Sequence, residues 1–600
     1  MRTLLLLACA PAIMSAQSPD STTRDSSTNT RKLETVTVSA IRARNDAPVA
    51  AKTLDAAELQ RRSFGQDVPI MLQGTPSLTS YAETANYWGY SYIRMRGIDQ
   101  SRINLTLDGI PLNDPEDQVL YFTDFPDLTA SLGSVQVQRG VGTSAPGSAS
   151  YGGSINFQTT PLTSSTLRNA DVQLQAGSFG TLRGSAEYAS GLSGNGLAAY
   201  GRISAIRSGG YRRHSGVDAR SGFMSVGWVG NKDVVKLTAT AGLFADTMAY
   251  VGATRAELAA DERTNALRPD ETDRFGEQLV ALSHTRDLGN GASIANTLYR
   301  ISAKGNYDVC IASCATPTGN DNWNFHLDFA WLGATSVANF NWGDTRITTG
   351  VNANTYARDH DAFDRGAGML SLYTNTGRKR DASVFAKFER DLGKATLFAD
   401  VQGRRAQFSY QPDVAAGIQR TSIGWNFLNP KVGATYRLTP SLSAFASYGV
   451  NGREPARNDM LAGFDNISAS DSSAIFVGPL SRVRPERVRD TELGLRKRAA
   501  HWSLDGNLFA MEFRDEILPV GQLSYIGTPL RTNVPSSWRR GIELDGSAEF
   551  DRLRVGATTT LMRARISSFT DATTSILYKD VAPLLTPEFT ATHWATMQLS

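Results

Sequence analysis

The most constraining feature of this chain is an alternation of apolar and polar residues. It recurs in many segments of residues 161–600. Clear examples are 172–176, 234–243, 382–388, 395–401, 502–513 and 553–562. Alternation places apolar side chains on one face of a strand and polar ones on the other. A strand in the wall of a membrane barrel needs one face for lipid and one for a wet lumen. We therefore expect an antiparallel transmembrane β-barrel over 161–600.

The connections between these segments support a membrane barrel over a soluble β-sandwich or propeller. Tight turns are expected at 193–196, 230–233, 289–291, 343–344, 393–394, 439–441 and 551–552. Long polar loops are expected at 207–220, 246–275, 303–322, 359–380, 411–424, 450–489, 515–536 and 568–586. Short and long connections alternate, as they do between the two ends of an outer-membrane barrel. Roughly 18 strands are predicted in this way.

The N-terminus is typical of an export signal, which we place at 1–16. Arg2 supplies the charge, 4–14 is apolar, and Ser15 with Ala16 offers small residues for cleavage. A lipoprotein box ending at Cys9 is the alternative. In an exported chain we expect the two remaining cysteines, Cys310 and Cys314, to form a disulfide in an outer loop. A zinc site is the alternative, but no nearby ligand set completes it.

Residues 17–42 are expected to form a disordered leader, since 17–31 is almost entirely polar. Within the leader, the run 34–40 is β-prone, and its β-branched residues favour an extended chain. A free strand on a tether can pair with the sheet edge of another protein, and a stray linker strand is the alternative. The run comprises Glu34, Thr35, Val36, Thr37, Val38, Ser39 and Ala40.

Residues 43–160 have a mixed α/β character and are expected to form a compact domain. A helical pattern runs over 56–72, with Asp55 as a possible N-cap. Short strands are expected at 92–97, 103–109 and 135–140, and Asp108-Gly109 is a strong turn signal.

Several ordered motifs resemble those of TonB-dependent outer-membrane receptors, of the ferric-siderophore-receptor type. Residues 34–40 resemble the TonB box, and Ile93-Arg94-Met95-Arg96-Gly97 resembles the I-R-x-R-G element of the plug. The segments 107–112 and 137–156 resemble its L-D-G-[IV]-P and closing glycine-rich elements. Barrel elements of the same receptors are resembled by 429–433, 447–455, 484–486, 491–494 and 540–543. The resemblance implies a plug domain at 43–160 inside a barrel of 22 strands. About four strands would then lie beyond residue 600.

The resemblance also implies partners and a set of plug–barrel contacts. The 34–40 run would bind TonB, which acts with ExbB and ExbD in the periplasm. Arg96 and Arg139 of the plug would face Glu492 and Glu543 of the barrel wall and hold the plug in place. The strand pattern agrees, because Leu493, Leu495, Ile542 and Leu544 would face lipid and leave both glutamates in the lumen.

No catalytic constellation is found, so we expect no enzyme, no cofactor and no resident metal. The six histidines are scattered, and neither a P-loop nor a Gly-x-Ser-x-Gly elbow occurs. A net charge of +3 gives no argument for nucleic acid. Candidate ligand contacts lie in the plug loops: Tyr81, Tyr87, Trp88, Tyr90, Tyr92, Arg102, Asp114 and Asp117. The aromatic residues can stack on a planar chelate or pack against the barrel, and the acidic loop can meet a cation or water. Arg212, Arg213 and His214 can attract an anionic chelate or contact lipopolysaccharide.

The expected function is TonB-dependent import of a scarce, bulky nutrient across the outer membrane of a Gram-negative-type bacterium, by a monomer. A ferric siderophore is the first expectation, and cobalamin, a glycan or another metal chelate is the alternative. A signal-transducing receptor and a passive porin are alternatives of a different class.

Overall fold

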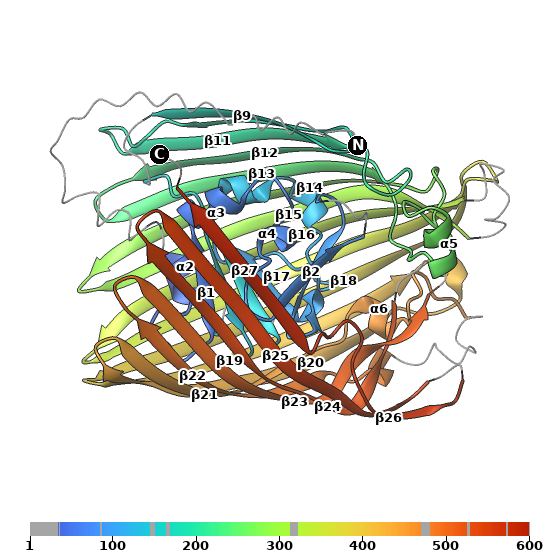
Figure 1. Ribbon diagram of the computed structural model, residues 1–600. Coiled ribbons are helices and arrows are strands. Elements are labelled where there is room, and N and C mark those ends of the chain that lie inside the picture. Colours follow the sequence, from blue (N-terminus) through green and yellow to red (C-terminus); the bar gives the residue numbers. More distant parts are fainter. Residues whose placement is uncertain are drawn as a thin grey trace, which may run out of the picture.

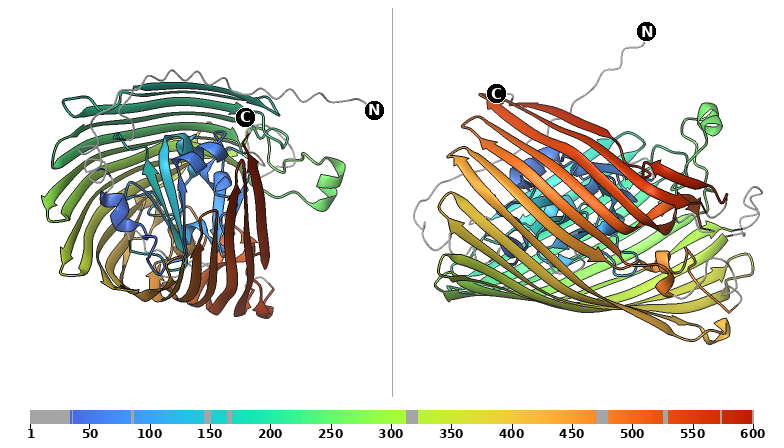
Figure 2. Two further views of the ribbon diagram at one scale, coloured as in Figure 1. Left: turned by 60° about the vertical axis from the view of Figure 1, so that its left-hand side comes forward. Right: turned by 90° about the horizontal axis from the view of Figure 1, so that it is seen from below.

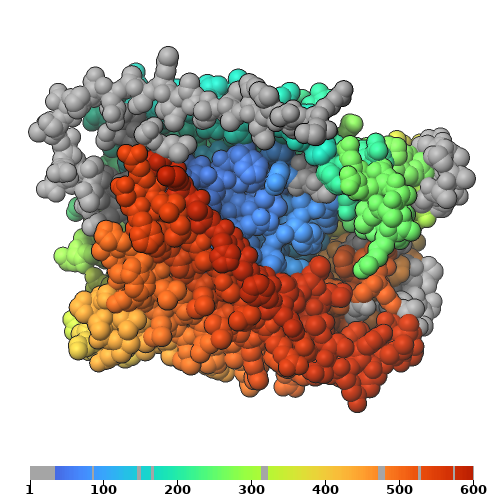
Figure 3. Space-filling model, in the orientation of Figure 1, coloured from blue at the N-terminus to red at the C-terminus, as the bar shows by residue number. Residues whose placement is uncertain are grey.

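The computed structural model describes residues 34, 36–83, 87–144, 151–163, 168–311, 322–469, 480–524, 529–571 and 574–598. A curved wall of long antiparallel strands surrounds a smaller N-terminal domain, which lies in the hollow of the wall (Figure 1; Figure 2, left). In the space-filling view, the N-terminal domain in blue is visible beside the red C-terminal strands (Figure 3). The expected arrangement of a plug inside a barrel is confirmed.

Within the described residues the barrel has nineteen strands, β9 to β27, close to the predicted number. They are β9 (Asn169–Gly177), β10 (Thr181–Ala189), β11 (Leu197–Ser208), β12 (Val217–Val229), β13 (Asp233–Thr247), β14 (Thr272–Gly289), β15 (Ala292–Cys310), β16 (Asn322–Trp342), β17 (Thr345–Asp364), β18 (Leu370–Leu392), β19 (Ala395–Pro412), β20 (Thr421–Thr439), β21 (Leu442–Arg453), β22 (Glu486–Arg498), β23 (Trp502–Leu523), β24 (Pro529–Phe550), β25 (Leu553–Thr570), β26 (Leu577–Val581) and β27 (Phe589–Met597). Each strand from β9 to β24 pairs with the next, and β26 and β27 both pair with β25.

Side chains alternate across the wall as the sequence predicts. On β22, Leu493 and Leu495 are each 53% exposed on the outer face, whereas Val488 and Glu492 on the opposite face are buried. The alternation separates an apolar outer face from a polar inner one, as a lipid-embedded barrel requires.

The predicted turns lie at one end of the barrel, and three predicted loops are shorter than expected. Only 365–369 separates β17 from β18, although 359–380 reads as a loop. Strands β15, β23 and β24 likewise run into the predicted loops 303–322 and 515–536. The prediction takes these polar stretches for loops. A hairpin that extends beyond the apolar belt keeps its backbone hydrogen bonds, but both of its faces meet water and its side chains can therefore be polar on both. Longer connections contain α5 (Arg255–Ala260), η4 (Val414–Ala416), α6 (Arg457–Met460) and η6 (Leu480–Arg482).

The N-terminal domain contains two small sheets. A five-stranded sheet has the order β1-β7-β8-β5-β6, and a three-stranded sheet has the order β2-β3-β4. The strands are β1 (Ala51–Asp55), β2 (Leu78–Ala82), β3 (Ser91–Met95), β4 (Ile98–Asp99), β5 (Ile103–Leu107), β6 (Ile110–Pro111), β7 (Leu132–Arg139) and β8 (Gly153–Thr159). The helices are α2 (Val36–Ile41), α3 (Ala56–Arg62), α4 (Val68–Met71), η1 (Gln100–Arg102), η2 (Phe122–Asp124) and η3 (Leu128–Ser131). None of the helices in the described residues is long and apolar enough to cross a membrane.

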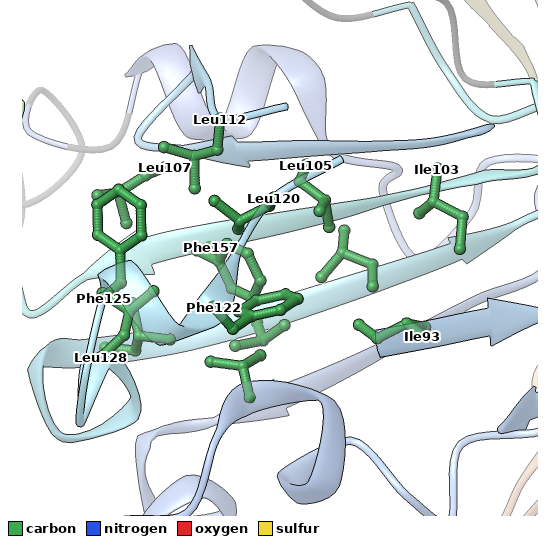
Figure 4. Packing of buried hydrophobic residues seen from close by; sticks show 14 of the residues in the cluster. Ile93, Ile103, Leu105, Leu107, Leu112, Leu120, Phe122, Phe125, Leu128 and Phe157 are labelled. Atoms are coloured by element: carbon green, nitrogen blue, oxygen red, sulfur yellow. The ribbon is translucent and has the colours of Figure 1, made fainter. Parts of the chain in front are cut away.

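A large apolar core holds this domain together. Leu105, Leu107, Phe122 and Phe157 pack between the larger sheet and η2 (Figure 4). The predicted Asp108-Gly109 turn joins β5 to β6, and both residues have positive φ, 49° and 85°. Glycine meets this requirement without strain, and aspartate is among the residues that tolerate it.

The predicted helix over 56–72 is wrong in its middle. Asp55 caps α3 as expected by accepting a hydrogen bond from the Glu58 amide at 2.9 Å, but α3 ends at Arg62. Gly65 has a φ of +89°, and a Cβ there would lie 2.2 Å from Nε of Arg183 on the wall. The chain leaves the helix at Ser63, and the positive φ of Gly65 beside the wall does not allow the helix to continue through this position.

Candidate functional site

Four charged residues join the plug to the barrel wall, and all four are buried. Arg96 donates from Nε to Oε1 of Glu543 and from Nη1 to Oε1 of Glu492, each at 2.8 Å. Nη2 of Arg96 donates to the second oxygen of Glu543 at 3.0 Å, so this pair is bidentate. Arg139 donates from Nε to Oε2 of Glu543 at 2.9 Å. The structure thus brings together the four residues that the family resemblance implies for this contact.

The turn between β3 and β4 aims Arg96 at the wall. Arg96 has a φ of 53° and Gly97 a φ of 73°, which reverses the chain and projects the guanidinium outward. The guanidinium carbon lies 3.8 Å from the ring centroid of Phe509 on β23. A planar cation between a carboxylate and an aromatic face is held in one orientation.

A second charged contact involves the acidic plug loop that follows β6. Arg358 of β17 donates to both oxygens of Asp117, at 2.7 and 3.1 Å, and the Tyr356 hydroxyl donates to Asp114 at 2.6 Å. Glu116 lies 2.8 Å from Arg358 and 3.0 Å from His360. The sequence leaves open whether this acidic loop meets a cation or water, and in the structure its carboxylates meet the guanidinium of Arg358 on the wall. Sequence reasoning missed Tyr356, Arg358 and His360, although their i, i+2, i+4 spacing on one strand face is a signal.

Arg102 does not face a ligand space, contrary to its selection from the sequence. It is 2% exposed, donates from Nε to Glu486 at 2.9 Å and from Nη1 to Asp99 at 2.6 Å. A buried guanidinium needs such partners, and the wall strand β22 supplies one of them.

The five aromatic residues of the plug loop separate into three environments. Trp88 is buried against Ile206 and Phe244 of the wall, and its indole donates to the Gly65 carbonyl at 2.6 Å. Tyr81 and Tyr87 are 41% and 54% exposed. Tyr90 and Tyr92 line a cavity between plug and wall. Plug–barrel packing thus accounts for Trp88, and Tyr90 and Tyr92 are available to a ligand in the cavity.

The cavity has a volume of about 220 Å³ and lies between plug and wall. Asp114 and Asp117 also line it, as do Met248 to Tyr250 of the long connection after β13 and Asp465 of the connection after β21. The cavity therefore lies toward the end of the barrel that carries the long connections. Burial raises the pKa of the plug carboxyls Glu83 and Asp124, which line it, to about 8 each.

The run 34–40 is not the exposed strand that its composition predicts. From Val36 the chain forms the helix α2, in which Val36, Val38, Ala40 and Ile41 are buried. The Lys387 ammonium of the wall donates to the Ala40 carbonyl at 2.6 Å, and Glu34 accepts from the amides of Leu162 and Thr163. Apolar burial between plug and wall outweighs the β-propensity of the run, which is a weak preference. Thr35 lies outside the described residues.

Cys310, the last residue of β15, is disulfide-bonded. Its predicted partner Cys314 lies outside the described residues, so the pairing of these two cysteines stays a prediction.

No set of three or more histidine, cysteine or acidic side chains in the described residues is arranged to hold a metal ion.

Comparison with known proteins gives the family. The family model "TonB dependent receptor-like, beta-barrel" matches residues 210–598, and "TonB-dependent Receptor Plug Domain" matches residues 43–154. No curated protein sequence matches the chain.

Solved structures share the fold at low sequence identity. The ferric citrate transporter FecA, unliganded, is 15% identical with a TM-score of 0.73, covering 92% of this chain and 82% of that one. The copper transporter OprC is 15% identical with a TM-score of 0.73, covering 92% and 84%. The siderophore receptor PiuA from Acinetobacter baumannii is 16% identical with a TM-score of 0.71, covering 93% and 86%. From the two family matches and this shared architecture, the chain belongs to the TonB-dependent receptors.

Proposed function

We propose that this protein lies in the outer membrane and imports a ferric siderophore, driven by TonB together with ExbB and ExbD. The observation that carries the proposal is the cavity between plug and wall, toward the long connections. Long connections lie outside the cell in outer-membrane barrels, so the cavity is placed to receive a solute from that side. Solved structures of the same fold include a ferric citrate transporter and a siderophore receptor.

The contacts of the plug suggest how import is driven. Plug and wall are joined by buried ion pairs at Glu543 and at Arg358, which hold the plug against the wall. The run 34–40 offers an extended-chain former to a periplasmic partner, but in the resting state it is packed as α2. We propose that binding of TonB requires α2 to leave this position, after which force on the chain disturbs the plug.

The alternative ligands are cobalamin, a glycan or another metal chelate, and one similar structure is a copper transporter. A signal-transducing receptor that does not transport is a further candidate. A passive porin is disfavoured because the plug packs against the wall along buried contacts such as Arg96 with Glu492.

Growth of a deletion strain tests the proposal. Iron-limited cells lacking the gene are given single ferric siderophores, ferric citrate, a copper chelate and, in a cobalamin-dependent background, cobalamin. We expect loss of growth on one ferric siderophore and recovery when the gene is restored. Normal growth on every iron source, with loss on cobalamin or copper, would contradict the siderophore proposal and assign the alternative.

A further inference from the structure

One wall of the cavity is acidic, and two of its carboxylates lie directly opposite each other. Asp246 on β13 and Asp273 on β14 are register partners on neighbouring antiparallel strands. Both are buried, and both line the cavity. Like charges at directly opposite positions destabilise a sheet, so this arrangement calls for a compensating group.

Two further carboxylates extend the acidic wall. Glu277 follows Asp273 by four residues on β14 and faces the same side, and Asp124 of η2 shares a hydrogen bond with Glu277. The plug reaches this position because β13 has glycine at 242. A Cβ there would lie 2.0 Å from the Asp124 carbonyl oxygen. The fifth carboxyl, Glu83, comes from the plug chain after β2 and also lines the cavity.

Buried oxygens of this wall lack partners. Asp246 is 5% exposed, and neither of its carboxylate oxygens has a hydrogen-bond partner among the described residues. One oxygen of Asp273 accepts from the Tyr90 hydroxyl, whereas Oδ1 of Asp273 and Oδ1 of Asp124 have no partner there. An unsatisfied buried acceptor costs about 1–3 kcal/mol, more if it is charged.

The basic residues of the cavity do not compensate this wall. Arg358 is paired with Asp117 and Glu116, and Arg457 lies 3.1 Å from Asp465. Within the described residues, no lysine, arginine or histidine forms an ion pair with Glu83, Asp124, Asp246, Asp273 or Glu277. Aromatic side chains stand beside the acidic wall instead, among them Tyr90, Tyr92 and Tyr121.

We infer that the cavity recognises a cationic group, an ammonium or guanidinium, carried on an arm of the imported solute. This inference rests on the proposed function and narrows its ligand to solutes that present a positive charge to the plug. Nitrogen donors on the cationic group satisfy the free oxygens of Asp246 and Asp273, and the tyrosine rings contribute cation–π attraction. An anionic chelate would find no such partners on this wall.

Binding of matched fluorescent probes to the purified receptor tests the inference. Dansylcadaverine has a primary ammonium on a five-carbon arm, its N-acetyl derivative is neutral, and dansyl-6-aminohexanoate ends in a carboxylate. We expect the ammonium probe to bind at least about ten-fold more tightly than the neutral one, and the carboxylate probe to bind most weakly. Detergent micelles without receptor supply the background. Equal affinities, stronger binding of the carboxylate, or no binding of any probe would overturn the inference.

Variants test whether the acidic wall causes the preference for the ammonium probe. Asp246→Asn with Glu277→Gln keeps the side-chain volumes and should remove the preference for the ammonium probe. The control, Asp218→Asn with Glu512→Gln, changes two exposed carboxylates of the wall and should keep it. Displacement of the ammonium probe by micromolar Mn²⁺ would instead assign the acidic wall to a bare metal ion.

The two proposals can fail separately. Uptake by living cells reports import, whereas probe binding reports the charge preference of the cavity. TonB-dependent uptake with no charge preference would overturn only the cationic ligand. A charge preference without uptake would leave the inference about the cavity and overturn the import function.

Discussion

Glu543 is the residue on which the plug–wall contacts converge. Arg96 and Arg139 donate to it from the plug, Asn507 donates from β23 at 3.1 Å, and the Ser77 hydroxyl donates from the chain before β2. A carboxylate in a closed interior is tolerated only with such partners. The same contacts tie three separate plug segments to one wall strand.

Replacing both wall glutamates should loosen the plug. Glu492→Ala with Glu543→Ala leaves Arg96 and Arg139 buried without carboxylate partners, at a cost of about 3–5 kcal/mol for each broken pair. We expect cells carrying this variant to become sensitive to a large antibiotic that the outer membrane normally excludes. Asp505→Ala is the control, because it removes an ion pair at the surface: the partner, Arg498, has a side chain that is 54% exposed. Equal resistance in the two variants would show that the four-residue contact does not hold the plug.

The cavity carboxyls predict a pH dependence for the ammonium probe. Glu83 and Asp124 have pKa values raised to about 8 by burial, so below that pH each carboxyl holds a proton in the empty cavity. A bound cation displaces those protons, so affinity should rise between about pH 6 and pH 8 and level off above it. Glu83 faces Arg212, Tyr92 and Asp246, and Asp124 faces Asp114, Asp273 and Glu277.

The affinity for the ammonium probe is measured against pH for the parent protein and for the double variant Glu83→Gln with Asp124→Asn. The double variant should show a flatter pH profile than the parent. A parent affinity that falls as the pH rises would contradict the assignment of these carboxyls.

At the scale of elements, the proposed binding of TonB competes with the packing of α2 against the wall. Val36 is the first residue of α2 within the described residues, and the amides of a helix's first turn have no partner inside the helix, so proline is tolerated there. Val36→Pro should therefore preserve the resting structure and surface binding of solute, yet abolish uptake, because proline cannot donate to a β-ladder with the partner. Val36→Ala retains the amide and should transport. Normal uptake by the proline variant would exclude strand pairing at this residue.

The sequence predicts those elements that depend on residues close together in the chain. The alternation around Glu492 and Glu543 shows which face each glutamate takes, and Asp108-Gly109 marks its turn because both residues suit positive φ. The close approach at Gly65 and the burial of Val36 and Val38 depend on the wall, which is far away in sequence. The opposition of Asp246 and Asp273 depends on strand register, which the periodicity of either strand alone does not give.

At the scale of the whole molecule, plug and wall form one packed unit. The apolar core of the plug continues into the wall at Leu279, Tyr299 and Trp331. A solute in the cavity has packed protein beneath it at rest. Passage thus requires work on the plug, and the cavity alone does not supply that work.

The most direct measurement is uptake of radiolabelled iron, carried on the siderophore identified by growth, in cells with and without TonB. We predict that energised cells with TonB accumulate iron over time, whereas cells lacking TonB retain only the amount that binds at the surface. Accumulation at the same rate in both strains would contradict the account, because it would mean that solute passes the plug without energy from the partner.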